Sequence, residues 1–351
     1  MPASNMKKVY RFIEPKDELS ILVNEKANLL FEKLQQVDVQ QSQLDEFGKY
    51  YLSNHHLSKR LYFSLESSAA IIYASVKMSG KPVGELNFTD YGAGLGTLFL
   101  LAGMMGFKKV FYNDHFASWE ANARVLCRDL DIEMTDYIVG DIDELLAYAK
   151  ETALQYDIIA SRNVVEHIYD LPAFYSKLYH SGIAPLFYST TTANYHNPLM
   201  LLKHRLLHKK LEKIQFRQQR QEKLQRVVPG INDKDLEALT ELVRGRAFTD
   251  FDNAVYAWQQ KQAITPVRWL GSNTCDCENG VWAEHIIPRS AYKEIIEGAG
   301  YRMEYSAGFW DTHYRYAVFN WTTAVLNRLA GLLGKKGYMI TPFVNVIASK
   351  P

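Results

Sequence analysis

The sequence predicts an α/β fold, in which a doubly wound, mostly parallel, seven-stranded sheet carries a helical N-terminal leader and a helical insertion after the fifth strand. Two observations support this fold class. From residue 86 onward, short apolar runs alternate with helical patterns, as is typical of a parallel sheet covered on both faces. Before residue 86 the apolar positions follow helical spacing alone, so we expect residues 1–85 to form an all-helical leader.

Composition sets limits on function. The chain has 351 residues, of which 47% are hydrophobic, so it is long enough to bury a substantial core. Its net charge of +1 generates no overall field for nucleic acid or membrane, although local patches are left open. The three cysteines, Cys127, Cys275 and Cys277, are too few for a disulfide framework, so we expect free thiols and a cytoplasmic protein.

Targeting segments are not evident from the sequence. Residues 1–17 lack the apolar run of a secretory signal. We also find no stretch of about 18 apolar residues that would span a bilayer.

The leader contains one segment with two interpretations. Helical spacing covers residues 18–80, and Gly80-Lys81-Pro82 ends the last helix. Between the helices, Tyr50 to His56 is rich in aromatic residues and histidine. This segment either packs as a helix junction or forms a wall or lid over a ligand pocket.

The alternating region predicts a core over 86–195 and 282–351. The expected strands are 86–91, 109–113, 136–139, 156–161, 186–190, 301–305 and 338–348, with helices at 95–105, 118–130, 142–150 and 289–298. Pro342 interrupts the last strand, which suggests an edge or a bulge there. The first five strands form a half-sheet on each side of a switch point, so a ligand is expected at their carboxyl ends.

A glycine turn follows the first strand. Gly92, Gly94 and Gly96 lack Cβ atoms, so the backbone can approach a ligand closely, and the N–H groups of the following helix point at it. The dinucleotide fingerprint G-x-G-x-x-G is not matched, because the third glycine comes one residue early and Thr97 stands in the last glycine's place. This spacing argues against NAD and FAD.

Residues 196–281 form the predicted insertion. Residues 199–228 resemble one long helix or a broken pair, and residues 203–226 carry nine Lys or Arg against two Glu, a charge of +7. Such a run is either a solvated helix face or a site for a protein partner or an anionic surface. The rest of the insertion is expected to cap the carboxyl edge of the sheet.

Four segments at strand ends carry a family resemblance. In chain order they are Asp90–Gly96, Asp114, Gly140–Ile142 and Asn163–Asp170. The series resembles the motifs of class I S-adenosylmethionine (SAM)-dependent methyltransferases, which have a Rossmann-like sheet, and the likeness covers 86–190 well and 282–348 loosely. It implies SAM as cofactor and S-adenosylhomocysteine (SAH) as product. The positions that it assigns to the cofactor are Asp90, Tyr91, Gly92, Ala93, Gly94, Gly96, Asp114, His115, Asp141, Ile142, Asn163 and Val164.

The resemblance also implies individual roles. The glycines would pass beside the methionine part of SAM, Asp114 would accept the ribose hydroxyl protons, and Asp141 with Ile142 would meet the adenine ring. Asp90 would shape the turn and lie near the ammonium group. Taken singly, each aspartate is equally suited to cap a helix or form a turn.

Catalytic candidates are three histidines. Ubiquinone-pathway O-methyltransferases have Glu-x-x-Glu-His at the fourth strand end, which can help to hold a metal, but Asn163 replaces the first Glu, so no metal is predicted. His167, His196 and His285 are candidates for a general base, because a neutral imidazole accepts protons near neutral pH. Each would also suit a packed or surface position.

These observations predict a methyltransferase that acts on a small-molecule or sugar acceptor, with O-methylation favoured over N-methylation. The leader and the C-terminal segment resemble enzymes of glycan or secondary-metabolite biosynthesis. Nucleic acid is disfavoured, because no basic sheet face or aromatic platform is evident. Two alternatives stay open: a non-catalytic SAM- or SAH-binding scaffold, and a nucleic-acid methyltransferase that uses the basic helix 199–228.

Overall fold

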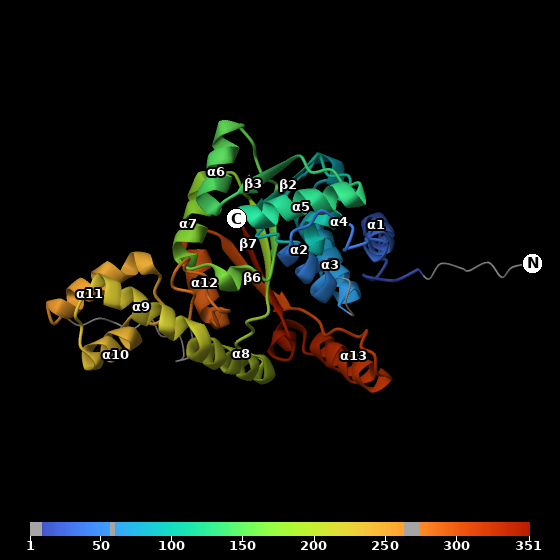
Figure 1. Cartoon of the computed structure of the whole chain (residues 1–351). Helices are drawn as coiled ribbons and strands as arrows, with labels where there is room; N and C mark the ends of the chain where they lie inside the picture. The colour runs from blue at the N-terminus through green and yellow to red at the C-terminus, as the bar shows by residue number, and fades with distance from the viewer. Residues whose placement is uncertain (1–8, 57–59, 263–273) are drawn as a thin grey trace, which may run out of the picture.

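A seven-stranded sheet forms the centre of the computed structural model, which describes residues 9–56, 60–262 and 274–351. The strand order is β3-β2-β1-β4-β5-β7-β6, and helices cover both faces (Figure 1). The strands are β1 Asn87–Tyr91, β2 Lys109–Asp114, β3 Asp136–Val139, β4 Ile158–Arg162, β5 Leu186–Thr191, β6 Arg302–Ala307 and β7 Val344–Ser349. This order confirms the doubly wound α/β fold that the sequence predicts.

The switch point lies between β1 and β4. Strands β1 to β5 are parallel, and β1 pairs with β2 on one side and with β4 on the other. Phe88, Ile159 and Phe187 lie within these strands and are fully buried, because helices cover both faces. A crevice therefore opens at the carboxyl ends of β1 and β4, where ligands bind in folds of this kind.

The C-terminal part of the sheet differs from the expectation. Residues Gly334–Met339 form a 3-10 helix, and β7 starts only at Val344, antiparallel to both β5 and β6. The predicted edge position is wrong, because β7 lies inside the sheet and β6 is its edge strand. Pro342 precedes the strand, so its missing N–H removes no ladder hydrogen bond. Helix α13 (Ala317–Leu332), between β6 and β7, was not predicted.

Two helical layers bury the two faces of the sheet. The leader helices α1 (Glu18–Gln35) and α3 (Leu61–Ser79) share one hydrophobic core with α4 (Thr97–Met104) and α5 (Ala117–Leu130). Three other helices cover the opposite face, and they are α6 (Ile142–Glu151), α7 (Leu171–Ser181) and α12 (Arg289–Gly298). The short helix α2 (Glu46–Tyr51), followed by a π-helical turn to His56, completes the described leader.

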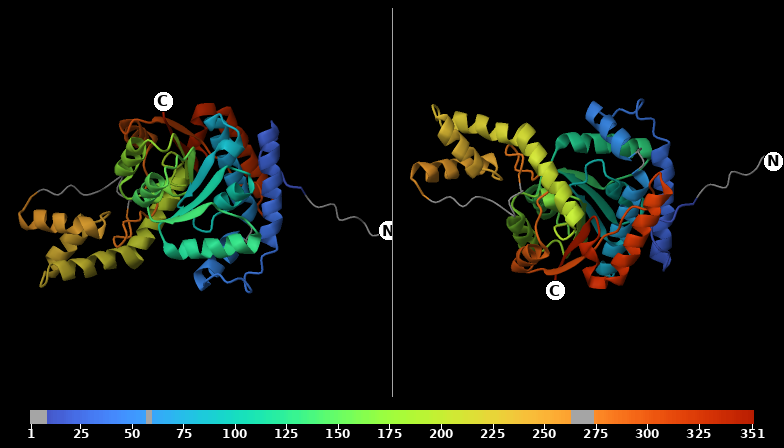
Figure 2. Two further views of the ribbon diagram at one scale, coloured as in Figure 1. Left: turned by 90° about the horizontal axis from the view of Figure 1, so that it is seen from above. Right: turned by 90° about the horizontal axis from the view of Figure 1, so that it is seen from below.

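The insertion after β5 projects from the sheet as a helical arm (Figure 2). Helix α8 (Pro198–Leu211) runs through a π-helical turn, Glu212–Phe216, into α9 (Arg217–Val227), so residues 198–227 are helical throughout. Helices α10 (Asp233–Leu242) and α11 (Phe251–Gln259) pack on α9 around a small core of their own. Its segments near residues 247 and 280 line the cavity at the carboxyl edge of the sheet.

Candidate cofactor pocket and active site

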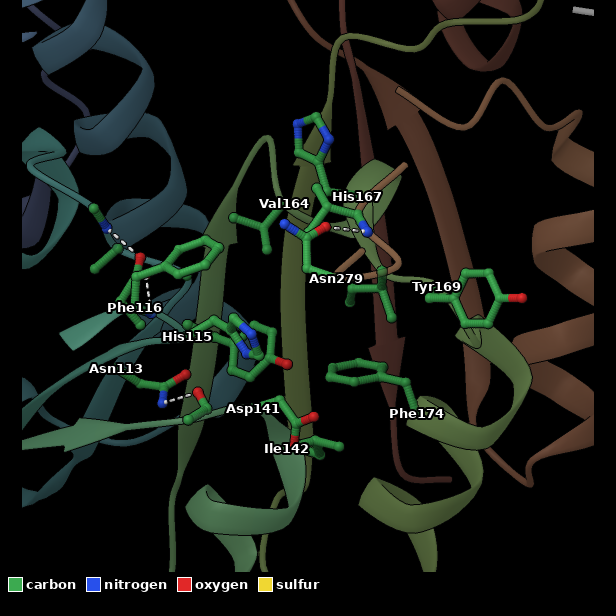
Figure 3. A pocket seen from close by; sticks show the side chains of 18 of the residues that line it. Asn113, His115, Phe116, Asp141, Ile142, Val164, His167, Tyr169, Phe174 and Asn279 are labelled. Carbon is green, nitrogen blue, oxygen red and sulfur yellow. Dashed lines mark hydrogen bonds between the residues drawn. The ribbon is translucent and has the colours of Figure 1, made fainter. Parts of the chain in front are cut away.

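A cavity of about 710 Å³ lies at the carboxyl ends of β1, β2 and β4 (Figure 3). Its volume falls within the range of small-molecule sites, roughly 300–1,000 Å³. Every residue that the sequence assigned to the cofactor lines this cavity, and so does His167. His196 and His285 are not among the lining residues.

The glycine turn shapes the floor of the cavity. Gly92 has a φ of 68°, and a Cβ there would lie 2.6 Å from Val164 Cγ1, so a larger residue is excluded by both backbone and space. Gly94 has a φ of 51°, but a Cβ there would meet nothing within 4 Å. The backbone at Gly94 is thus open to the cavity, as a close approach by a ligand requires.

Asp114 ties the glycine turn to the loop after β2. Its Oδ2 accepts the Gly94 N–H at 2.8 Å and its Oδ1 accepts the Phe116 N–H at 3.0 Å. Burial raises the pKa of the Asp114 carboxyl, and these two N–H groups oppose that rise. Each oxygen keeps a second lone pair, so the same carboxylate can accept further hydrogen bonds from the cavity.

Asp141 acts as the N-cap of α6. Its Oδ1 accepts the Asp143 N–H at 2.9 Å, while the Glu144 carboxylate accepts the Asp141 N–H at 2.9 Å, which completes a capping box. The capping interpretation of this aspartate is therefore confirmed. Asp141 is also exposed to the cavity, beside the Ile142 side chain (Figure 3). A carboxylate has about four acceptor positions, so capping leaves acceptor capacity for a ligand.

Asp90, which is buried, and Arg162, which is half-buried, also line the cavity, and Arg162 was not predicted from the sequence. Burial raises the pKa of the Asp90 carboxyl well above its usual range, and the positive charge of Arg162 opposes this rise. Burial lowers the pKa of Arg162, and the electrostatic effects of Tyr51 and Asp90 oppose this fall. The available signal was a charged residue at the end of the apolar strand β4.

Tyr51 brings the leader to the cavity. It lies at the end of α2 and is one of the lining residues, together with Trp119 from α5. Its ring packs edge-on against Trp119, with centroids 5.0 Å apart. This position favours the wall interpretation of the aromatic segment that begins at Tyr50.

Asn163 adopts a left-handed backbone conformation directly after β4. Its φ is 60°, a region that asparagine tolerates better than most residues. The Asn163 N–H donates to Thr190 O at 3.0 Å, and its Oδ1 accepts the Thr190 hydroxyl at 3.2 Å. These bonds to β5 hold the turn, so the strained residue positions Val164 against Gly92.

His167 is placed for proton transfer. Its Nδ1 lies 2.7 Å from the carbonyl oxygen of Trp282, and a carbonyl can only accept, so Nδ1 carries the proton of the neutral ring. Nε2 is then the basic nitrogen. The ring is half-buried and lies above Val164 at one end of the cavity (Figure 3).

The other two predicted bases have packing roles. His196 Nε2 accepts the Arg289 N–H at 3.1 Å, and burial, with a smaller effect of Arg289, lowers the pKa of its imidazole. His285 is buried and stacks on Trp282 with ring centroids 4.3 Å apart, and burial lowers the pKa of its imidazole to about 3. Of the three predicted bases, the structure brings only His167 to the cavity.

The described residues contain no group of three or more His, Cys, Asp or Glu side chains that could hold a metal ion. Glu166, beside His167, is fully buried, and its Oε1 accepts the Thr192 N–H at 3.0 Å. It does not line the cavity. All three cysteines are free and buried.

The wall opposite the glycine turn comes from distant parts of the chain. Tyr169 and Phe174 follow β4, whereas Asn279 and Gly280 belong to the insertion (Figure 3). Gly280 has a φ of 75° and approaches the Tyr169 ring. Sequence reasoning could not find these neighbours, because no local pattern pairs residues about 110 positions apart.

Comparisons with solved structures find methyltransferases at low similarity. A SAM-dependent methyltransferase from Mesorhizobium loti is 17% identical, with 79% of this chain and 96% of that chain covered and a TM-score of 0.38. A Haloferax volcanii protein described as a methyltransferase, in complex with the activator Trm112, is 13% identical, with 88% and 97% covered and a TM-score of 0.40. A protein described as a methyltransferase and crystallised with SAH is 17% identical, and the match spans 37% of either chain with a TM-score of 0.29.

No protein-family model and no curated protein matches the chain. The fold is that of class I methyltransferases, because the sheet order places an antiparallel β7 between β5 and β6. What the protein does must be inferred from its own cavity.

Proposed function

We propose that the protein binds SAM in this cavity and transfers its methyl group to an acceptor. One observation supports this most strongly: the segments that end β1, β2, β3 and β4 converge on a single cavity. Within it, the Asp114 carboxylate is tied directly to the open backbone at Gly94. A coincidental set of helix caps and turn residues would not require this convergence.

The chemistry of the lining residues fits the parts of SAM. Gly94 leaves room beside the backbone for the methionine part, where Arg162 offers a positive charge to its carboxylate and Asp90 offers a carboxyl oxygen as acceptor to its ammonium group. Asp114 retains acceptor capacity for ribose hydroxyls. Asp141, with the apolar side chains of Ile142 and Phe116, suits the amino group and the faces of an adenine ring.

Methyl transfer requires alignment of two partners and exclusion of water. Bound SAM would supply a methyl group on a sulfonium, which leaves as SAH. His167 Nε2 is the acceptor for the proton that a hydroxyl loses as its oxygen bonds to carbon. Trp282 holds the imidazole in the tautomer that this role needs.

For the acceptor we propose a small molecule or sugar, methylated on a hydroxyl. Support comes from the polar side chains on the wall opposite the glycine turn, which include Lys177, Thr249 and Asn279. The nucleic-acid alternative loses part of its support, because two cations of the basic helix bind carboxylates of the insertion itself. Arg220 pairs with Glu212, and Arg217 lies 2.6 Å from Glu241.

Calorimetry with SAM and SAH, followed by transfer of a labelled methyl group to pools of sugars, phenols and lipids, tests the proposal. We expect one SAH per chain and turnover on a hydroxyl-bearing pool. His167→Ala should keep SAH binding and lose turnover, whereas His180→Ala, at an exposed position on α7, should keep both. Binding without turnover on any pool would favour the scaffold alternative, and absence of binding would refute both.

A further inference from the structure

Helix α13 carries its apolar residues on the outside. Its exposed side chains include Val318, Trp321, Val325, Leu329 and Leu332, which follow each other at spacings of three and four residues and so form one stripe. Trp321 is 70% exposed. The side chains that α13 buries are Thr323 and Ala330. This pattern is the reverse of a helix whose apolar face packs on a protein core.

Helix α8 has the same reversed pattern. Leu199, Leu202 and Leu206 are exposed at helical spacing, while the buried side chains of α8 are His204 and His208. His204 Nε2 donates to Thr192 O at 2.8 Å and its Nδ1 contacts the Glu284 carboxylate. Polar contacts therefore attach α8 to the core. Its leucines stay exposed to solvent and can contact another surface.

The two stripes share a strongly positive setting. The exposed cations on or beside them are Lys203, Arg205, Lys209, Lys210, Lys213, Arg315, Arg328, Lys335 and Lys336. None forms an ion pair with a residue in the described parts of the chain. Across residues 199–214 and 312–351 the sequence contains one acid, Glu212, and Arg220 already pairs with it. This surface is therefore both apolar and cationic.

Helices α8 and α13 lie on the same side of the molecule. Both are at the lower edge in Figure 1, and both face the viewer when the molecule is seen from below in Figure 2. The sheet register explains this, because Thr191 before α8 pairs with Val344, the first residue of β7, and Val344 pairs with Ala307 before α13. Both helices thus depart from the carboxyl edge of the sheet, which also carries the cavity.

We propose that this surface, formed by α8 and α13, docks the protein on a membrane that contains anionic lipid. Leucine, valine and tryptophan side chains at helical spacing, flanked by Lys and Arg, are what an interfacial helix inserts among lipid headgroups. No helix of the described chain is long and apolar enough to cross a bilayer, so the contact is peripheral. A second copy of the chain fits poorly, because a symmetric contact would oppose like charges with no acids to pair them.

Docking brings the sheet edge that carries the cavity to the lipid surface. An amphiphilic acceptor would follow from this only if the proposed methyl transfer holds. The docking itself does not depend on that activity.

Cosedimentation with vesicles tests the docking directly. The probes are vesicles of phosphatidylcholine alone and vesicles with about 30% phosphatidylglycerol, a charge density that attracts basic segments. We expect the full chain to sediment with the anionic vesicles, and we expect this binding to weaken as salt rises. Failure to bind anionic vesicles at low salt would overturn the proposal.

Matched variants locate the contact. Leu202→Asp/Leu206→Asp and Trp321→Asp/Leu332→Asp should each lower vesicle partitioning at least about tenfold, because they place charge where apolar side chains enter the lipid. Ile21→Asp on α1 is the control, since Ile21 is 59% exposed and Leu206 is 60% exposed. The charge pair Lys209→Glu/Lys210→Glu should weaken binding to anionic vesicles only, whereas Lys108→Glu/Lys150→Glu should not.

Sedimentation velocity and SAH calorimetry on the same variants distinguish membrane docking from self-association and from misfolding. Retained SAH binding shows that a variant is folded, so loss of vesicle binding alone supports the docking proposal. A wild-type dimer that the Trp321→Asp/Leu332→Asp variant dissociates, without vesicle binding, would assign the surface to a second copy. Wild-type vesicle binding in both stripe variants would also contradict the proposal. Absence of SAH binding by the wild type would refute the proposed function, whereas its binding to vesicles would still support the docking proposal.

Discussion

The two walls of the cavity are built in different ways. The wall that we assign to the cofactor comes from residues 90–94, 96, 113–116, 140–142 and 162–164, each segment at the carboxyl end of a parallel strand. The opposite wall combines residues 167–177 with segments of the insertion near 247 and 280. Backbone geometry defines the first wall, whereas side chains from distant segments define the second.

This difference predicts which substitutions weaken cofactor binding and which leave it intact. Gly92 has no space for a Cβ beside Val164, Asp114 accepts the Gly94 N–H and Asn163 bonds to Thr190, so we expect substitutions at these three residues to weaken cofactor binding. Asn279 and Thr249 lie on the other wall, where we expect substitutions to change the acceptor and leave SAH affinity intact. Four predictions, from the largest effect to the smallest, test this division.

The largest effect is expected at His167, where the two walls meet. His167→Ala removes the proton acceptor and should lower kcat by about 10²–10⁴-fold, the usual contribution of general acid–base catalysis. The affinity for SAH, measured by calorimetry, should change little. An unchanged kcat in a folded variant that still binds SAH would remove His167 from catalysis.

Asp114 should give a pH dependence with two opposite signs. Burial raises the pKa of its carboxyl, so the folded apo protein binds this proton more tightly than the unfolded chain, and the free energy of unfolding falls as pH rises through that window. SAH affinity should do the reverse and weaken as pH falls, because ribose hydroxyls need the ionised carboxylate. Asp114→Asn should reduce the pH dependence of both the unfolding free energy and the SAH affinity. Burial also raises the pKa of Asp90, so the contribution of Asp90 to the pH dependence should remain in the variant. Equal slopes in wild type and variant would refute this role.

Gly92→Ala should weaken both the fold and the cofactor site. A Cβ at φ 68° is strained by about 1–2 kcal/mol and would also displace Val164. Gly106→Ala is the control, because Gly106 has a φ of 80° but open space around its Cβ position. Denaturant unfolding should show a loss of stability in both variants. SAH affinity should fall only in Gly92→Ala, and an equal fall in both would argue against a specific cradle.

The smallest effect is expected on the opposite wall. Asn279→Ala removes a polar group without changing the backbone, so it should raise the acceptor KM several-fold, by about 1 kcal/mol for a lost neutral hydrogen bond. Its affinity for SAH should equal that of wild type. A large loss of SAH affinity would show that this wall also holds the cofactor.

Sequence reasoning found the residues of the wall that we assign to the cofactor, because they lie at the ends of apolar strands. The ends of β1, β2, β3 and β4 could each be found from the change of an apolar run into glycine or acid. The same logic should have drawn attention to Arg162, which ends β4 in the same manner. It was missed because Asp90, whose charge interacts with it, is distant in sequence and lies on the neighbouring strand β1.

The rest depended on tertiary contacts. His285 and His196 were plausible bases from their residue type, but one stacks on Trp282 and the other binds the Arg289 N–H, and only the fold reveals this. Helix α13 was not predicted. Its apolar residues face outward, and the side chains that it buries are Thr323 and Ala330. The basic run also divides in the structure. Arg217 and Arg220 of α9 bind carboxylates, whereas the cations of α8 form no ion pair within residues 9–56, 60–262 and 274–351.

The central claim is that the cavity at the glycine turn binds SAM through Asp114. Calorimetric titration of SAH into the wild type and into Asp114→Ala tests it most directly. We predict one SAH per chain in the wild type and a loss of about 1.5–3 kcal/mol in the variant, roughly 10- to 150-fold in Kd, for a hydrogen bond to a charged group. No binding to the wild type, or equal affinity in a folded variant, would contradict it.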